Sequence, residues 1–337
     1  MACVIAVAQG ALLSESQNQF LFSKYITNFN KTYEVVDMFR KYAVFKENID
    51  MILNHNLSDD STYKMGVNQF TDMTSEEFAA YVNLNNAREK AREIDETEPI
   101  PQEEFLESID IGLPDIDWVA KFPNYPVKDQ GTCSASGIFA TTYTYSFYLF
   151  KELVYPIMLS EQQLVDCMGF GCGNPLPISA FTYISHHNGI CPGNSYPFHG
   201  VEGSCKTDCG PKIYKYFSLF TVTGSEAALA GAIKNGPVAV VIDATPSCFQ
   251  HYSSGVLTNC PGTNDTLNHF VVAVGLGQSE GVEFFKIRNS WGTSWGEAGY
   301  ARIQYGVDTV SIGRGLRINF GIYPKINIGV EPKTSDL

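Results

Sequence analysis

The sequence has no Cys-x-x-Cys pair, since the window that opens at Cys133 closes with Ser136. The paired ligand spacings of structural zinc sites are therefore missing, and we expect neither a metal nor another cofactor. Strongly apolar runs long enough to cross a bilayer are missing as well. The uncharged stretch 131–150 is too rich in Ser, Thr, Tyr and Gly for that role, so the sequence predicts no membrane span.

Basic residues are scarce. The chain has 23 Lys and Arg against 36 Asp and Glu, which gives a net charge of −13 at pH 7 and a pI near 4.9. This balance argues against nucleic acid or an anionic membrane surface as a partner. With 337 residues, of which 44% are hydrophobic, the chain can bury the core of one large domain or two.

Cysteine is the informative residue type among those present. Eight of the nine cysteines fall between residues 133 and 260, and Cys3 lies apart from them. An even cluster of this kind predicts disulfides and an oxidising compartment, with reduced cytosolic thiols as the alternative. Residues 2–13 are apolar enough for a short signal-peptide core, although no basic segment precedes them.

The stretch Gln130-Gly-Thr-Cys-Ser-Ala-Ser-Gly137 precedes a long apolar segment, 138–154. Gly131 favours a turn, and Ser134 or Ser136 is expected to cap a helix that follows. The N-terminus of a helix favours negative charge, so this is a suitable place for a nucleophile. The alternative is a capped core helix without chemistry.

Two later stretches favour the chemical interpretation: Leu267-Asn-His-Phe270 before a Val-rich run, and Arg288-Asn-Ser-Trp-Gly292. Together the three stretches resemble the papain-like cysteine peptidases, whose motifs are Gln-Gly-x-Cys-Gly-Ser-Cys-Trp, a His before a strand, and Asn-Ser-Trp-Gly. The resemblance places Ser136 at the position of the nucleophile, with Gly137 in place of the Trp. It implies His269 as the base, Asn289 as the residue that orients it, and Gln130 as the oxyanion donor.

The resemblance also implies a peptide-binding edge. The stretch Gly171-Cys-Gly-Asn-Pro175 stands where the family has Gly-Cys-Asn-Gly-Gly, which makes Gly173, Asn174 and Pro175 candidate substrate-binding residues. Proline has no N–H to donate, so a bound peptide would lose one hydrogen bond there. Trp291, by the same analogy, covers the region of Asn289. Cys133 is the alternative nucleophile, but the family ties this position into a bridge.

The N-terminal third resembles the inhibitory propeptide of the cathepsin L-like branch. Residues 16–58 are expected to form two helices, and the second carries the spacing of that propeptide's signature: Asp37, Lys41, Phe45, Asn48, Ile52 and Asn56. A second propeptide motif follows at Gly66-x-Asn68-x-Phe70-x-Asp72. Thr74 and Glu77 then form a capping-box pattern at a further helix start.

These resemblances predict an α+β, papain-like fold with a helical left lobe and a barrel-like right lobe of strands. We divide the chain into a candidate signal peptide (1–15), a helical inhibitory propeptide (16–83), an acidic linker (84–112), a peptidase domain (113–324) and a C-terminal tail (325–337). Expected helices cover 159–167 and 176–188. Expected strands are Val238–Ile242, Phe270–Val274, Phe284–Arg288 and Tyr300–Ile303, with a turn over Gly275–Gly281.

The cysteines follow the family in part. The resemblance implies the bridges Cys133–Cys172 and Cys167–Cys205. Cys260 matches half of a third family bridge whose other position reads Gly315. We therefore pair Cys260 with Cys248 and Cys191 with Cys209 because both spans are short, although spacing alone does not determine connectivity.

Three functions remain open. The first is a cathepsin L-like homologue, made as a proform, that lacks normal cysteine peptidase activity, as do some relatives with Ser for Cys such as testins. The second is a weak hydrolase that uses Ser136, His269 and Asn289, as described for silicateins. The third is a cysteine endopeptidase whose nucleophile was replaced. We expect a secreted or lysosomal/vacuolar monomer that holds its own propeptide, and later a peptide or protein, in the cleft.

Overall fold

The structure is a computed structural model that describes residues 12–59, 61–82, 102–105, 113–122, 125–206, 208–215, 217–222, 225–262, 267–312 and 321–326. Most of the expected signal peptide, most of the acidic linker, Gly315 and most of the expected tail lie outside the described residues.

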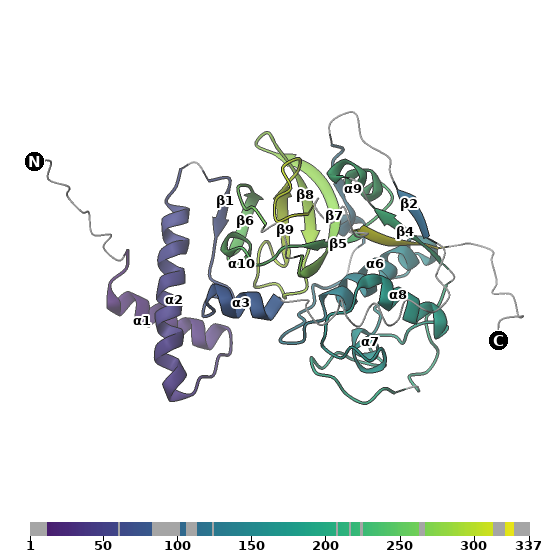
Figure 1. Ribbon diagram of the computed structural model, residues 1–337, viewed down its shortest axis with the longest axis horizontal. Helices are drawn as coiled ribbons and strands as arrows, with labels where there is room; N and C mark the ends of the chain where they lie inside the picture. The colour runs from purple at the N-terminus through teal and green to yellow at the C-terminus, as the bar shows by residue number, and fades with distance from the viewer. Residues whose placement is uncertain are drawn as a thin grey trace, which may run out of the picture.

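Two crossed helices, α1 (Glu15–Asn28) and α2 (Val35–Asn56), form one end of the molecule, as expected for residues 16–58 (Figure 1). They enclose a small core of their own, formed by Phe22, Tyr25, Phe45 and Ile49. Phe45 and Ile49, one helical turn apart on α2, therefore face α1.

Asp72, the last residue of the second propeptide motif, ties this end together. Its carboxylate accepts hydrogen bonds from Tyr25 (2.6 Å), Tyr33 (2.8 Å) and Lys31 (2.9 Å). Burial acts to raise the pKa of Asp72, but these three donors outweigh burial and lower it. The motif thus fixes the chain that follows α2 against α1.

The predicted capping box is confirmed at the start of α3 (Ser75–Val82). The N–H of Thr74 donates to Glu77, and the N–H of Glu77 donates to the Thr74 hydroxyl at 3.2 Å. Glu77 also forms ion pairs with Arg40 (2.6 Å) and Lys41 (2.9 Å) on α2. The start of α3 is therefore bound to the long propeptide helix.

Helices form one lobe of the second domain: α6 (Ser136–Leu153), α7 (Glu161–Cys167) and α8 (Pro177–His186) (Figure 1). The α6 helix is buried on all sides from Ser136 to Leu149, as its apolar composition requires. Ser160 caps α7 through the N–H of Gln163. Short helices elsewhere are α5 (Trp118–Lys121), α9 (Glu226–Ile233) and α10 (Ser247–Gln250).

Strands form the other lobe, in the order β1-β6-β9-β8-β7-β5-β10-β4-β2, with β3 paired to β7. Their ranges are β1 (Tyr63–Met65), β2 (Gln102–Phe105), β3 (Ile116–Asp117), β4 (Phe217–Val222), β5 (Val238–Ile242), β6 (Tyr252–Leu257), β7 (His269–Ser279), β8 (Val282–Arg288), β9 (Tyr300–Gln304) and β10 (Gly321–Ile326). The two outermost strands, β1 and β2, both precede residue 113, so the N-terminal segments extend both edges of the sheet.

The expected turn over Gly275–Gly281 is wrong in its extent. Strand β7 continues through Ser279, and only Glu280 and Gly281 make the turn, with φ of 50° and 83°. Two successive positive φ values are those of a tight two-residue hairpin. Gly275 is needed for packing instead, because a Cβ there would lie 2.3 Å from the carbonyl oxygen of Ile116 on β3.

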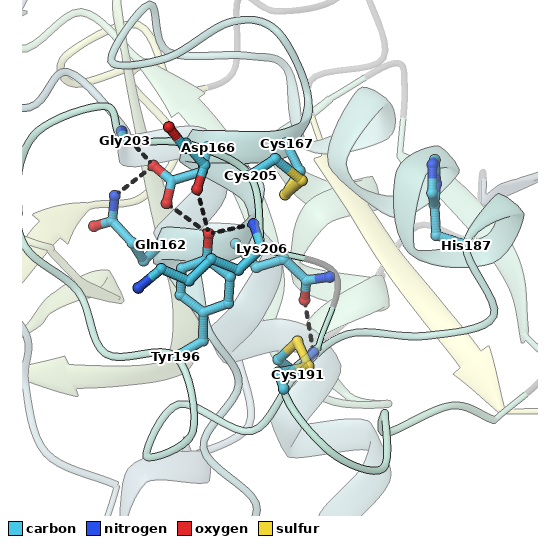
Figure 2. Close-up of a disulfide and its surroundings, with 12 residues drawn as sticks. Gln162, Asp166, Cys167, His187, Cys191, Tyr196, Gly203, Cys205 and Lys206 are labelled. Atoms are coloured by element: carbon cyan, nitrogen blue, oxygen red, sulfur yellow. Dashed lines mark hydrogen bonds between the residues drawn. A yellow bond between two sulfur atoms is a disulfide. The ribbon is translucent and has the colours of Figure 1, made fainter.

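The described residues contain four disulfides, Cys133–Cys172, Cys167–Cys205, Cys191–Cys209 and Cys248–Cys260, which are the pairs expected from the sequence. Figure 2 shows Cys167–Cys205 beside the hydroxyl of Tyr196. That hydroxyl donates to Asp166 (2.7 Å) on α7 and accepts from the N–H of Lys206 (3.1 Å). The long loop after α8 is thereby fastened to the helical lobe.

Candidate active site

His269 and Asn289 meet because their strands are neighbours. His269 begins β7 and Asn289 follows the last residue of β8, and antiparallel pairing brings these two ends together. His269 Nε2 lies 2.8 Å from Asn289 Oδ1. The indole of Trp291 packs over the imidazole with 4.5 Å between ring centroids. The structure thus brings together three residues that the sequence placed in one site.

The environment of His269 favours a neutral ring. Burial lowers the pKa of His269 to about 4, although the hydrogen bond with Asn289 acts in the opposite direction. Above that pH the ring carries one proton, and donation from Nε2 to Asn289 leaves the basic lone pair on Nδ1. His269 is therefore suited to accept a proton as a general base. It is less suited to stay protonated as one partner of a permanent ion pair.

The hydroxyl of Ser136 makes two hydrogen bonds, and neither involves His269. It donates to Asn174 Oδ1 at 3.0 Å and accepts from the N–H of Phe270 at 3.0 Å. These are its hydrogen bonds within the described residues, and the side chain is fully buried. A serine has a single proton to donate, so this proton is committed to Asn174.

The expectation that Ser134 or Ser136 caps the helix is wrong. The N-cap of α6 is Ala135, and no side chain caps it from that position. Asn174 instead supplies an acceptor from another segment, since its Oδ1 also accepts from the N–H of Gly137 at 2.8 Å. Asn174 was expected to bind substrate, and its contact with Ser136 has no signal in the sequence.

Gln130 is held by the loop that follows β8. Its backbone N–H donates to the carbonyl of Ser290 at 2.8 Å, and its side-chain oxygen accepts from the Ser290 hydroxyl at 2.6 Å. One hydrogen of its amide goes to the carbonyl oxygen of Cys133 at 3.1 Å. The amide carries a second hydrogen, which is the group an oxyanion would need. Ser290 is a positioning residue that the sequence motif contained but did not distinguish.

The candidate substrate-binding loop lies directly against the start of α6. The disulfide Cys133–Cys172 and a β-bridge between Ser134 and Gly173 join the two segments. Asn174 and Pro175 are buried between them. The loop therefore covers the residue that the family resemblance places at the nucleophile position.

The propeptide covers the other side of the site. Phe70 and Phe78 pack edge-on against Trp291, with ring centroids 5.0 and 5.6 Å apart. Gln69 donates to the carbonyl of Trp291 at 2.6 Å, and Tyr81 donates to the carbonyl of Gly131 at 2.7 Å. These propeptide contacts were not predicted, because a sequence motif does not say which surface its aromatic residues meet.

Within the ranges that the structure describes, no cluster of three or more His, Cys, Asp or Glu side chains could hold a metal ion. In the same ranges, no helix is both long and apolar enough to cross a membrane.

Fold and site define a two-lobed domain of the cysteine peptidase type, with its propeptide packed on it. Residues 113–318 match the model of the papain family cysteine proteases, and residues 22–78 match the cathepsin propeptide inhibitor domain. The chain therefore belongs to the papain family of cysteine proteases and carries the inhibitor domain that precedes it in cathepsins.

Similar proteins and solved structures support the same family assignment. Germination-specific cysteine protease 1 of Arabidopsis thaliana is 36% identical over 82% of this chain and 75% of its own length. Fruit bromelain of Ananas comosus is 32% identical over 86% of this chain and 82% of its own length. Among solved structures, digestive procathepsin L 3 of Tenebrio molitor superposes with a TM-score of 0.79 at 32% identity, over 93% of this chain and all of the other. The fold is thus that of a procathepsin.

Proposed function

We propose that this chain is a cathepsin L-like peptidase homologue, made as a proform, in which Ser136 stands at the nucleophile position and normal cysteine peptidase activity is absent. The observation that carries the proposal is the hydroxyl of Ser136, whose proton is donated to Asn174 and not to His269. A hydroxyl without a base at its proton is a poor nucleophile.

The chemistry of the side chain supports the same conclusion. A cysteine thiol ionises near pH 8.5 unperturbed, and a helix N-terminus or a neighbouring imidazolium lowers that value. A serine must instead lose its proton during attack, and serine hydrolases support their histidine with a carboxylate. Here the partner of His269 is the neutral amide of Asn289. An imidazolium formed at His269 would be buried without a compensating charge from that partner.

The function that remains is binding. The propeptide already packs on Trp291, so the same aromatic surface suits a peptide or protein ligand once the propeptide is gone. Pro175 would offer that ligand one hydrogen bond fewer than a glycine would. Four disulfides favour an oxidising compartment, so we infer a secreted or lysosomal/vacuolar protein.

One observation favours a second function, that of a weak hydrolase. His269 and Asn289 are paired at 2.8 Å, and Gln130 has an amide hydrogen to offer an oxyanion. A substrate that displaced Asn174 from Ser136 would leave the hydroxyl free to meet a base.

The test uses the chain processed by an added protease. An organophosphonate that labels nucleophilic serines is applied to the wild type and to Ser136→Ala, and fluorogenic peptides are assayed in parallel. We expect no labelling at residue 136. We also expect any residual peptide turnover to be the same in the wild type and in Ser136→Ala. Labelling of Ser136 that Ser136→Ala abolishes would support the hydrolase. Recovery of ordinary cathepsin rates by Ser136→Cys alone would show that only the nucleophile separates this chain from an active enzyme.

A further inference from the structure

The loop Gly171–Leu176 makes two hydrogen bonds with the start of α6 through one side chain. The Asn174 side-chain oxygen accepts the Ser136 hydroxyl at 3.0 Å and the Gly137 N–H at 2.8 Å. Asn174 is 1% exposed, and its backbone has a φ of 55°. Asn is among the few non-glycine residues that tolerate this left-handed conformation. The side chain is therefore directed into the start of the helix and away from solvent.

The start of α6 needs such an acceptor. The first N–H groups of a helix have no partners within the helix, and Ala135 at the N-cap has no side-chain oxygen to offer. Asn174 satisfies one of these donors from a segment nearly 40 residues further along the chain. The bond thus joins the stability of the helix start to the position of the loop.

The neighbouring residues are shaped to allow this approach. A Cβ built on Gly137 would lie 2.0 Å from the carbonyl oxygen of Pro175, a distance that no real contact allows. The loop backbone therefore occupies the space that a side chain at residue 137 would fill. The glycine at residue 137 thus leaves the space that the Pro175 backbone occupies against the helix.

We propose that the Gly171–Leu176 loop is a built-in plug over Ser136 and that Asn174 is the positioning residue that holds it in place. The inference rests on the proposed function, since it takes Ser136 as the counterpart of the nucleophile. It adds that inertness has two separable causes, a hydroxyl in place of a thiol and a loop that occupies the hydroxyl. A thiol at residue 136 would be shielded in the same way.

The test measures alkylation of a thiol at residue 136 in the full chain. Ser136→Cys is treated with iodoacetamide, and the peptide that contains residue 136 is quantified by mass spectrometry. The second change Asn174→Gly should raise the alkylation rate about fivefold, because the acceptor that holds the loop to the Gly137 N–H is lost together with a weak contact from the thiol. Asn174→Asp keeps the acceptor for the Gly137 N–H and tolerates the backbone conformation. Because its carboxylate also raises the pKa of the neighbouring thiol, its rate is compared with that of Ser136→Cys at a pH above both thiol pKa values, where it should stay slow.

One further variant controls for loosening of the fold, and another tests the same contact from the helix side. Asn188→Gly relieves an equivalent left-handed asparagine, with a φ of 51°, at an exposed position after α8, and should leave the rate unchanged. Gly137→Ala pushes on the Pro175 carbonyl from the helix side and should speed alkylation as Asn174→Gly does.

The pH profile of alkylation distinguishes loss of the specific Asn174 contact from a general increase in the mobility of the loop. Without Asn174 the helix N-terminus is free to stabilise a thiolate, so the alkylation profile of Ser136→Cys/Asn174→Gly should shift to lower pH. A rate raised equally at every pH would overturn the inference, as would equal rates with and without Asn174. Those outcomes leave the proposed function standing, because labelling of the wild-type serine tests that proposal separately.

Discussion

At the scale of single residues, His251 is a second buried imidazole with a measurable consequence. It is fully buried, and neither ring nitrogen has a hydrogen-bond partner among the described residues. Burial lowers its pKa to about 4, whereas an unfolded chain binds the proton near pH 6.5. His251 therefore does not lower the free energy of unfolding above about pH 6.5, and it lowers that free energy progressively as the pH drops towards 4.

His251→Leu should remove this pH dependence. The difference in unfolding free energy between variant and wild type should shift by about 2 kcal/mol in favour of the variant when the pH is lowered from 7 to 5. The reason is that leucine has no proton to release on folding. Urea unfolding of the proform at the two pH values gives the comparison. The exposed His186→Leu serves as control and should leave the pH dependence unchanged. Identical pH dependence in His251→Leu and wild type would contradict the burial argument.

Much of the site could be expected from motifs. The motifs contain His269 and Asn289, which pair, and Gln130, which Ser290 holds, and their roles in a reaction stay predictions. The bond from Ser136 to Asn174 could not be expected, since it joins segments through a loop conformation that no local signal encodes. That Ser136 is the nucleophile's counterpart stays a prediction.

At the scale of elements, the link between α2 and α3 is sensitive to acid. Burial acts to raise the pKa of Glu77, but hydrogen bonds from Lys41 and Arg40 outweigh it and hold the pKa at about 2. A carboxyl group whose folded pKa is depressed stabilises the fold above its unfolded pKa, near 4.3, and loses that contribution as the pH falls towards 2. The propeptide should therefore loosen below about pH 4.

Glu77→Gln tests this element. The variant should show faster cleavage of the propeptide by an added protease at pH 6, and a smaller further increase than wild type when the pH is lowered to 3. The control Glu47→Gln alters an exposed carboxyl on α2 that forms no ion pair among the described residues, and it should behave as wild type. Wild-type kinetics in Glu77→Gln would show that the ion pairs do not hold α3.

Elements with strong local signals were the predictable ones. Strand β5 was expected with its observed bounds, because it is a short, continuous apolar run. Helix α8 was expected within two residues, because it is rich in apolar residues and begins at a proline. Strands β4, β6 and β10 were missed. They are defined by partners distant in sequence, and pairing of that kind leaves little trace in local composition.

At the scale of the whole molecule, the proform should not process itself. If Ser136 is inert, purified proform kept at acid pH should stay full length, even though the propeptide loosens there. A trace of active cathepsin should convert it to a fragment that begins near Leu113. Mass spectrometry of both incubations distinguishes the cases, with Ser136→Ala as the control. Conversion of the wild type alone, absent in Ser136→Ala, would refute the inert site.

Removal of strand β2 during processing should also lower the solubility of the protein. This strand pairs with β4 at the edge of the sheet and lies ahead of the expected cleavage point. Once it leaves, β4 presents a row of unpaired backbone N–H and C=O groups, which other extended chains can join. The cut form should therefore precipitate more readily than the proform, and where the protease cuts relative to residue 102 determines how well the protein keeps in storage.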